Sequence, residues 1–582
     1  MKTTNSQTPT RRFLVASLVL VVVAFPGLLQ AQFAYVITTN LAVTITGYTG
    51  PGGTLAIPST ISGLPVAGIG HAAFQFSGLT NITLPYTLTN TIVGADAFQN
   101  CRSLLNINVD LNNPYYSSLG GVLFDKSQRT LVIYPYAKAG DYSIPATVTD
   151  IGQSAFDSCG LLSSVTIPNS VTVIGIGAFA GSGLTNASIG TNVVTIADDA
   201  FFSCGRLSSI TVPNGVTAIG NYSFANCGGL TNIIIPSSVR AIWNYAFANC
   251  AGLRSITIAN GVTGFGVNSF YGCTGLTSVT LPNSVINPGD STFYGCSGLT
   301  NATINGFQIG NNEFAYCTGL TSVTIGSSVT NIADNAFLNC GRLTSVIIPD
   351  NVINLGSDAF AVCSGLTHVT IGSGITNIAD GTFASCTSLT GITIPNTVTS
   401  MGASVFGGCT SLSSISIPDS IGPNLGPWTF QYCSNLTDVV IGSGVTNIWD
   451  LTFADCPRLN NVYFRGNAPS ANDPFVFLRD DVSIIHYLPW TTGWGPVFAN
   501  RPAIPWLPQI VTGDSNFGVK NLAFGFNVFW ASGINVVVEG STDLAKSVWV
   551  PLATDNLITG SFYFADPQWT NYPARYYRVH SL

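Results

Sequence analysis

A phenylalanine recurs about every 23 residues through most of this chain, and every cysteine lies three residues after one of them. The phenylalanines are Phe74, Phe98, Phe156, Phe179, Phe201, Phe224, Phe247, Phe270, Phe293, Phe314, Phe337, Phe360, Phe383, Phe406, Phe430 and Phe453. The cysteines are Cys101, Cys159, Cys204, Cys227, Cys250, Cys273, Cys296, Cys317, Cys340, Cys363, Cys386, Cys409, Cys433 and Cys456. A period of this length indicates a repeat protein, whose units bury their apolar faces only against one another.

Two repeats have serine where the others have cysteine. Ser77 and Ser182 occupy the position, and the leucines that follow them, Leu79 and Leu184, come one residue early. Cysteine therefore follows the length of the turn, which predicts a ladder of buried free thiols that pack as small apolar groups. Disulfides are the alternative in an exported protein, but parallel side chains do not suit their dihedral angle. Zinc is not expected, because the regular spacing lacks close ligand pairs.

One coil shows the repeat clearly. Residues 207–212 alternate in polarity, which predicts a short strand that ends at Pro213. Val216 and Ile219 form a second apolar pair, and the three-residue spacing of Phe, Cys and Leu over 224–230 suits a tight helical turn. The sequence predicts a mainly β fold: a solenoid of about 16 coils, with parallel strands and short helical turns, followed by a small all-β C-terminal domain.

The rest of the chain divides around this array. Two arginines before a short apolar run predict a secretory signal peptide over residues 1–31, with a retained membrane anchor as the alternative. The solenoid is expected over 32–465, with a hairpin insertion near 108–146 where the spacing breaks. Residues 466–508, rich in Pro, Trp and Gly, are interpreted as a C-terminal cap and linker. Strand patterns over 509–582 predict a small β-sandwich-like module.

Composition excludes several functions. Only 8% of residues are charged and the net charge is −7, so a nucleic-acid partner is not expected. No apolar run after the signal is long enough to insert into a membrane. Four scattered histidines and the lack of catalytic motifs predict a non-enzymatic protein with no metal or cofactor.

Aspartate recurs shortly before the phenylalanine, at Asp334, Asp358, Asp380 and Asp450. These side chains could cap the turn or, alternatively, bind calcium.

The outward side of the predicted strand is the candidate binding surface. Its positions are mostly small hydroxyl or amide residues, which would form ladders on one face, although such residues are also simply good exposed strand formers. His368, Asp438 and Tyr463 interrupt the pattern and are candidates for specific contacts. The candidate ligand-binding residues are Ser209, Thr211, Ser255, Thr257, Ser278, Thr280, Ser322, Thr324, His368, Thr370, Asp438 and Tyr463.

The motif L-x-x-I-x-I-P-x-x-V-x-x-I-x-x-x-A-F-x-x-C, matched repeatedly over residues 53–464, resembles the BspA-type bacterial surface leucine-rich repeat. Segments 113–135 and 488–495 also resemble stretches that accompany this family. The resemblance implies a curved β-solenoid on exported or cell-surface proteins that bind other macromolecules.

Together these features predict a secreted or cell-surface adhesion or interaction protein, which binds an extracellular protein or glycan on its solenoid. The alternative is a structural spacer of the cell envelope without a specific ligand. The identity of the ligand, the mode of attachment, the role of the C-terminal module and the oligomeric state stay open.

Overall fold

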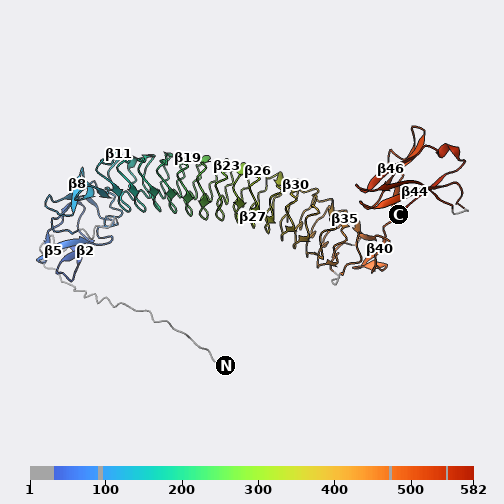
Figure 1. Cartoon of the computed structure of the whole chain (residues 1–582). Coiled ribbons are helices and arrows are strands. Elements are labelled where there is room, and N and C mark those ends of the chain that lie inside the picture. The colour runs from blue at the N-terminus through green and yellow to red at the C-terminus, as the bar shows by residue number, and fades with distance from the viewer. Residues whose placement is uncertain (1–31, 90–95, 471–474, 481, 545–547, 582) are drawn as a thin grey trace, which may run out of the picture. The chain divides into compact units, whose positions relative to one another are not determined.

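The computed structural model describes residues 32–89, 96–470, 475–480, 482–544 and 548–581. The predicted signal peptide lies outside these residues. The chain forms two compact units, residues 1–239 and 240–582, and each is described by itself. Almost every regular element is a short strand, and the strands stack coil upon coil within each unit (Figure 1). Among the described residues, no helix reaches the length and hydrophobicity that a bilayer span requires.

The first unit begins with a four-stranded sheet in the order β1-β2-β5-β4. Its strands are β1 (Phe33–Ile37), β2 (Val43–Tyr48), β5 (Leu64–Ile69) and β4 (Thr60–Ile61). Each coil then contributes a first and a shorter second strand. The first strands are β3 (Gly53–Ala56), β6 (Leu79–Leu84), β7 (Asn106–Val109), β11 (Gly140–Ser143), β13 (Leu162–Thr166), β15 (Asn186–Ser188), β17 (Ser209–Ile210) and β19 (Asn232–Ile235). The second strands are β12 (Asp150–Ile151), β14 (Val173–Ile174), β16 (Thr195–Ile196) and β18 (Ala218–Ile219).

The inserted segment of this unit folds as an antiparallel hairpin of β8 (Tyr116–Leu119) and β9 (Val122–Asp125). The next strand, β10 (Thr130–Ile133), pairs antiparallel with β9 and parallel with β12, so it returns the chain to the ladder of second strands. Buried Asn113 fixes the entry to the hairpin: its amide donates to the Pro85 and Leu88 carbonyls, at 2.8 and 3.2 Å.

The second unit continues the same coil design with parallel ladders. Its first strands are β21 (Ser255–Ile258), β23 (Ser278–Leu281), β24 (Asn301–Ile304), β26 (Ser322–Ile325), β28 (Ser345–Ile348), β30 (His368–Ile371), β33 (Ser414–Ile417), β35 (Asp438–Ile441), β37 (Asn461–Phe464), β38 (Ile484–Tyr487) and β40 (Arg501–Pro505). Its second strands are β20 (Ala241–Ile242), β22 (Gly264–Phe265), β25 (Gln308–Ile309), β27 (Asn331–Ile332), β29 (Asn354–Leu355), β31 (Asn377–Ile378), β32 (Ser400–Met401), β34 (Asn424–Leu425) and β36 (Asn447–Ile448). Strand β38 pairs in parallel with β37, and β40 with β38, so the ladder extends into the segment interpreted as a cap. A short strand, β39 (Val497–Phe498), closes this end antiparallel to β40.

The C-terminal module consists of two small antiparallel sheets. One contains β41 (Gln509–Val511), β42 (Gly518–Lys520), β43 (Ala523–Phe529) and β46 (Ser561–Asp566), and the other contains β44 (Asn535–Ser541), β45 (Val550–Asn556) and β47 (Tyr576–Ser581). Phe526, Val528, Val538 and Phe564 form the core between them. A single turn of 3-10 helix, η3 (Trp569–Asn571), precedes β47.

The phenylalanine lies in a tight turn, as expected, but this turn is not part of a regular helix. In the Phe270 coil, the Cys273 N–H donates to the Phe270 carbonyl at 3.3 Å, as a helical turn would require. Asn268 and Gly272, however, two residues to either side of the phenylalanine, have left-handed φ of 57° and 67°. A left-handed residue turns the chain out of the helical path. The Phe270 N–H bonds instead to the Thr292 carbonyl one coil later, at 2.9 Å.

The buried phenylalanines stack ring on ring through each unit. Neighbouring rings in the second unit, such as Phe270 and Phe293, lie 5.2 Å apart with planes 6° from parallel. The stack also includes aromatic residues outside the motif: Tyr134 packs on Phe156 at 4.9 Å, and Phe477 on Phe453 at 5.3 Å. These coils lack the Phe–Cys pair, so motif counting missed them. The described residues form about 19 turns, whereas the sequence predicted about 16 coils.

Candidate functional site

The outward positions of the first strands form two columns in exact alignment across neighbouring coils. Thr257, Thr280, Thr303 and Thr324 are one column, on β21, β23, β24 and β26. Register pairs Thr280 with Thr303 and Thr303 with Thr324, while Ser278, Asn301 and Ser322 pair in the same way beside them. We call the exposed residues of these two columns the strand-face platform. The platform has no charged residue, and its side chains project outward from the strand backbones.

Most platform hydroxyls have no partner inside the described part of the protein; Ser322 is an exception, since its hydroxyl donates to Asn301 Oδ1 at 2.6 Å. Thr257, Thr280, Thr324 and Ser278 are exposed and donate no intramolecular hydrogen bond. The threonine one position after the coil leucine behaves differently: the Thr277 hydroxyl donates to the Arg254 carbonyl one coil earlier, at 3.1 Å. The same bond recurs from Thr300 to Thr277 at 2.9 Å and from Thr321 to Thr300 at 3.0 Å. The second set of hydroxyls holds the coils together, whereas most of the platform hydroxyls are available to solvent or to a ligand.

The predicted site residues do not all lie together. Ser209 and Thr211, in the first unit, are exposed at β17, while Ser255 to Thr324 form the continuous platform of the second unit. His368 pairs in register with Ser345 and hydrogen-bonds the Thr367 hydroxyl through Nδ1 at 2.8 Å, and Thr370 is exposed beside it.

Asp438 and Tyr463 are half-buried and have internal partners. Asp438 Oδ1 accepts from the Asn461 amide at 2.9 Å. The Tyr463 ring packs on His486 and on Trp506, each with centroids 4.6 Å apart, and desolvation by this packing raises the pKa of its hydroxyl. Tyr463 thus contributes to the packing of the last coils, which leaves little of its ring for a ligand.

A second polar column, on the second strands, was not singled out from the sequence. Asn331 pairs in register with Asn354, and Asn424 with Asn447, whose side chains hydrogen-bond at 3.0 Å. A groove of about 320 Å³ runs over this column, lined by Asn311, Asn331, Asn354, Asn377 and Asp334 among others. The signal was present: asparagine repeatedly precedes the single apolar residue of the return strand. It was overlooked because that strand has only two residues, too few for a period of two to be visible.

Two of the four aspartates before the phenylalanine, Asp334 and Asp380, accept hydrogen bonds from the next coil. Asp334 Oδ1 accepts the Ser357 N–H at 2.8 Å, and Asp380 Oδ1 accepts the Ala403 N–H at 2.7 Å, each from the coil that follows. These bonds satisfy backbone donors at the turn, as the capping hypothesis required, but in the next coil rather than their own. In the described residues, no three His, Cys, Asp or Glu side chains come together in a group that could hold a metal ion.

All fourteen cysteines are free and buried, as the packing-ladder hypothesis predicted. Most of their thiols donate to the carbonyl of the phenylalanine one coil earlier, and Cys159 donates to the Tyr134 carbonyl; for Cys340 and Phe314 the sulfur–oxygen distance is 3.2 Å. Burial raises the pKa of Cys363, Cys409 and Cys456 to about 12, so these three thiols are neither charged nor nucleophilic at neutral pH, whereas the hydrogen bond with Cys227 lowers the pKa of Cys204. Ser182 takes the place of a cysteine in this column, and its hydroxyl lies 3.2 Å from the Cys204 sulfur.

The coils form a leucine-rich-repeat solenoid, and the repeat sequence identifies the type of leucine-rich repeat. The family model described as the BspA type leucine rich repeat region matches residues 67–137, 132–254, 240–367 and 355–474. This is more than half of the chain, which therefore belongs to the BspA-type leucine-rich-repeat family. Repeat proteins of this family are typically not enzymes.

Several solved structures are similar to this chain. A leucine-rich repeat protein from Bacteroides ovatus is 28% identical, with 70% of this chain and 93% of that chain covered and a TM-score of 0.47. A leucine rich cell surface protein from Faecalibacterium prausnitzii is 24% identical, with coverage of 73% and 95% and a TM-score of 0.31. The pneumococcal vaccine antigen PcpA is 15% identical, with coverage of 74% and 91% and a TM-score of 0.32. No curated protein matches the chain.

Proposed function

We propose that this protein is an exported, non-enzymatic repeat protein that binds a macromolecule, either protein or glycan, on its strand-face platform. The observation that carries the proposal is the presence of aligned, exposed hydroxyls without internal partners on neighbouring coils. A flat uncharged surface of this kind gains affinity from many weak contacts over a wide area, and not from electrostatic steering.

Surface display is part of the proposal. Family membership and the predicted signal peptide support it, as does the description of the Faecalibacterium relative as a cell surface protein. The alternative function, an envelope spacer without a ligand, would make the platform simply a soluble strand face.

The test combines a glycan array with affinity capture from an extracellular extract, both with the purified full chain. A variant with Thr280→Arg and Thr324→Arg places two long cationic side chains on the platform. It should abolish binding because a flat partner can no longer approach the strands. Thr274→Arg, at an exposed turn residue of the same region, is the matched control and should bind normally. If neither assay detects a ligand, the spacer function is favoured; if the Thr280/Thr324 variant binds normally, the platform is not the site.

A further inference from the structure

Residues of the last coils and of the C-terminal module line an open polar pocket. It has a volume of about 290 Å³, at the small end of ligand sites. Its lining consists of Ile392, Thr393, Ile394, Asn396, Ser416, Pro418, Asp419, Arg465 and Ser532. Thr393 and Ser416 belong to the outward column that continues the platform. Thr393 is connected to this column by a parallel β-bridge with Thr370. Ser532, in the loop between β43 and β44, is the contribution of the module.

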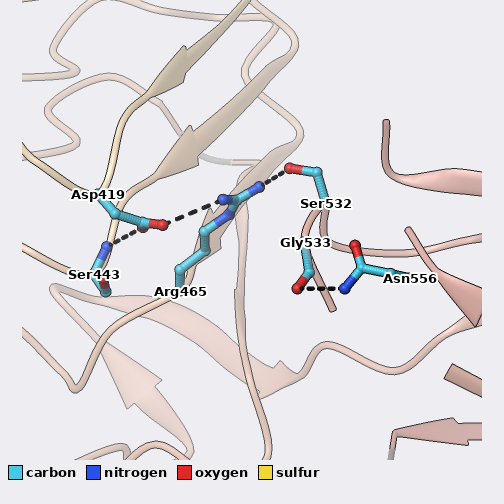
Figure 2. A network of polar contacts seen from close by, with 6 residues as sticks. All are labelled: Asp419, Ser443, Arg465, Ser532, Gly533 and Asn556. Atoms are coloured by element: carbon cyan, nitrogen blue, oxygen red, sulfur yellow. Dashed lines mark hydrogen bonds and ion pairs between the residues drawn. The ribbon is translucent and has the colours of Figure 1, made fainter. Parts of the chain in front are cut away.

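A charged pair fixes one wall of this pocket. Arg465, directly after β37, lies 3.5 Å from Asp419 Oδ2 through one terminal nitrogen and donates to the Ser532 hydroxyl through the other (Figure 2). Asp419 is held in turn by the Ser443 N–H, which donates to Oδ1 at 2.7 Å (Figure 2). The Nε–H of Arg465 has no acceptor among the described residues, so the guanidinium keeps unused donor capacity. These contacts restrict both side chains to one arrangement.

Apolar packing supports the module on the same side. Trp530, two residues before Ser532, is buried in a cluster with Leu488, Trp506 and Val536, and Tyr463 packs against it. The Trp530 indole N–H donates to the Trp506 carbonyl at 3.0 Å. The module is therefore attached to the last coils by a buried hydrophobic contact, and Ser532 is placed reproducibly at the pocket. Without the module, the pocket would lose one wall and the second partner of Arg465.

We propose that this pocket binds the terminal unit of a neutral glycan, an inference that rests on the proposed binding function and names its ligand class. The two charges cancel, so Asp419 disfavours an anion and Arg465 disfavours a cation. The remaining polar groups, the hydroxyls of Thr393, Ser416 and Ser532 and the Asn396 amide, include both donors and acceptors. Half-buried Ile392 adds a small apolar surface, and Ile394 and Pro418 are buried beside it. Hydrogen-bonding groups of both kinds beside a small apolar patch match a sugar ring, which carries hydroxyls around an apolar C–H face.

The test measures binding of the full chain to an array of neutral sugar termini (glucose, galactose, mannose, fucose and N-acetylglucosamine) and acidic ones (sialic acid and glucuronate). Neutral termini should bind, and Ser416→Ala/Thr393→Val should weaken binding at least tenfold by removing two hydroxyls at nearly constant volume. Ser532→Ala should weaken it less. The matched control, Thr274→Val/Ser297→Ala, makes the same chemical change at exposed turn residues outside both the platform and the pocket, and it should bind as the wild type does. Ser278→Ala/Thr280→Val makes that change on the platform and separates platform binding from pocket binding. Unchanged melting temperatures establish that each variant is folded.

Three outcomes overturn the inference. Preference for acidic termini contradicts the neutral class. Loss of glycan binding in the Ser278/Thr280 variant but not in the Ser416/Thr393 variant places the ligand on the platform, and the proposed function then survives without the pocket. Failure of the full chain to bind any glycan also overturns it, while capture of an extracellular protein in the parallel assay would still support the proposed function.

Discussion

At the scale of single residues, Glu313 departs most clearly from the repeat. The position before the phenylalanine is Ala, Ser, Thr or Val in the other coils, and Glu313 is fully buried there. One carboxylate oxygen accepts the Gly310 N–H at 2.7 Å, and the other has no partner in the described structure. Desolvation, with a contribution from Asp290, raises its pKa from 4.5 to about 8 in spite of the Gly310 bond. Glu313 is therefore protonated in the fold at neutral pH.

This protonation predicts a pH-dependent stability. The pKa of Glu313 is higher in the folded state than in the unfolded state. Its contribution to the free energy of unfolding is therefore complete below about pH 4.5 and is lost as the pH rises toward 8. Glu313→Gln removes the titration, so at pH 9 the variant should be more stable than the wild type by on the order of a few kcal/mol. Urea unfolding at several pH values measures this difference.

Ser269→Ala is the matched control for Glu313→Gln. It changes a buried residue of the same column, and it should keep the pH slope of the wild type because it removes no titratable group. Equal slopes for the wild type and Glu313→Gln would show that the carboxyl is already ionised in the fold.

At the scale of the structural element, the phenylalanine turn explains what each coil position tolerates. The residue two positions after the phenylalanine is left-handed in every described coil, and it is usually Asn, Ser or Gly, which tolerate that conformation. Val362 is an exception with φ of 59°, a costly conformation for a β-branched side chain. The left-handed conformation directs the Val362 N–H toward the next coil, where it donates to the Ala384 carbonyl at 2.7 Å.

Relief of this strain should stabilise the protein. Val362→Asn introduces the residue found at the same position in Asn226, Asn249 and Asn339, and we expect a gain of about 1 kcal/mol. The reverse change, Asn339→Val, should cost a similar amount. Chemical denaturation measures both, and a Val362→Asn variant no more stable than the wild type would contradict a strained turn.

The cysteine ladder makes a second prediction at this scale. Native protein should react slowly with a thiol reagent because the thiols are buried and keep their protons, whereas denatured protein should show close to fourteen free thiols. Ser278→Cys, on the exposed platform, is the positive control and should add one rapidly reacting thiol. Clearly fewer than fourteen thiols after denaturation without reductant would indicate disulfides.

At the scale of the whole molecule, the coils depend on their immediate neighbours. Repeat proteins of this kind gain stability from the interfaces between adjacent units, so damage to one coil spreads to the next ones first. The stack of phenylalanine rings is a continuous apolar component of these interfaces, with 5.0 Å from Phe247 to Phe270 and 5.2 Å from Phe270 to Phe293.

Phe270→Ala should therefore destabilise the protein by roughly 3–5 kcal/mol and open the adjacent coils first. Hydrogen exchange should show lost protection around β21, β23 and β24 before more distant strands are affected. Tyr271→Ala, at the partly exposed neighbouring residue, should cost far less. Uniform loss of protection along the unit would contradict nearest-neighbour coupling.

The sequence by itself determined the coil and its direction of packing. Phenylalanine, cysteine and leucine at constant phase can only be buried together if the coils stack in register, because each coil is too small to have a core of its own. The outward columns could be predicted for the same reason, since strand side chains alternate. The coils of Tyr134 and Phe477 were missed because they keep the aromatic ring but not the motif around it.

Only the tertiary structure decided which polar residues are available. Thr277 and Thr280 are chemically identical and three residues apart, yet one hydroxyl bonds to the preceding coil and the other has no internal partner. Tyr463 looked like a ligand contact in the sequence, but residues that follow it by 23 and 43 positions, His486 and Trp506, pack over its ring. The Arg465 pocket likewise depends on a loop of the C-terminal module. Thr277 and Tyr463 contact equivalent positions of an adjacent coil, but periodicity does not specify which side-chain groups meet there. Trp506 and Ser532 come from segments outside the repeat, and no periodic pattern encodes their contacts.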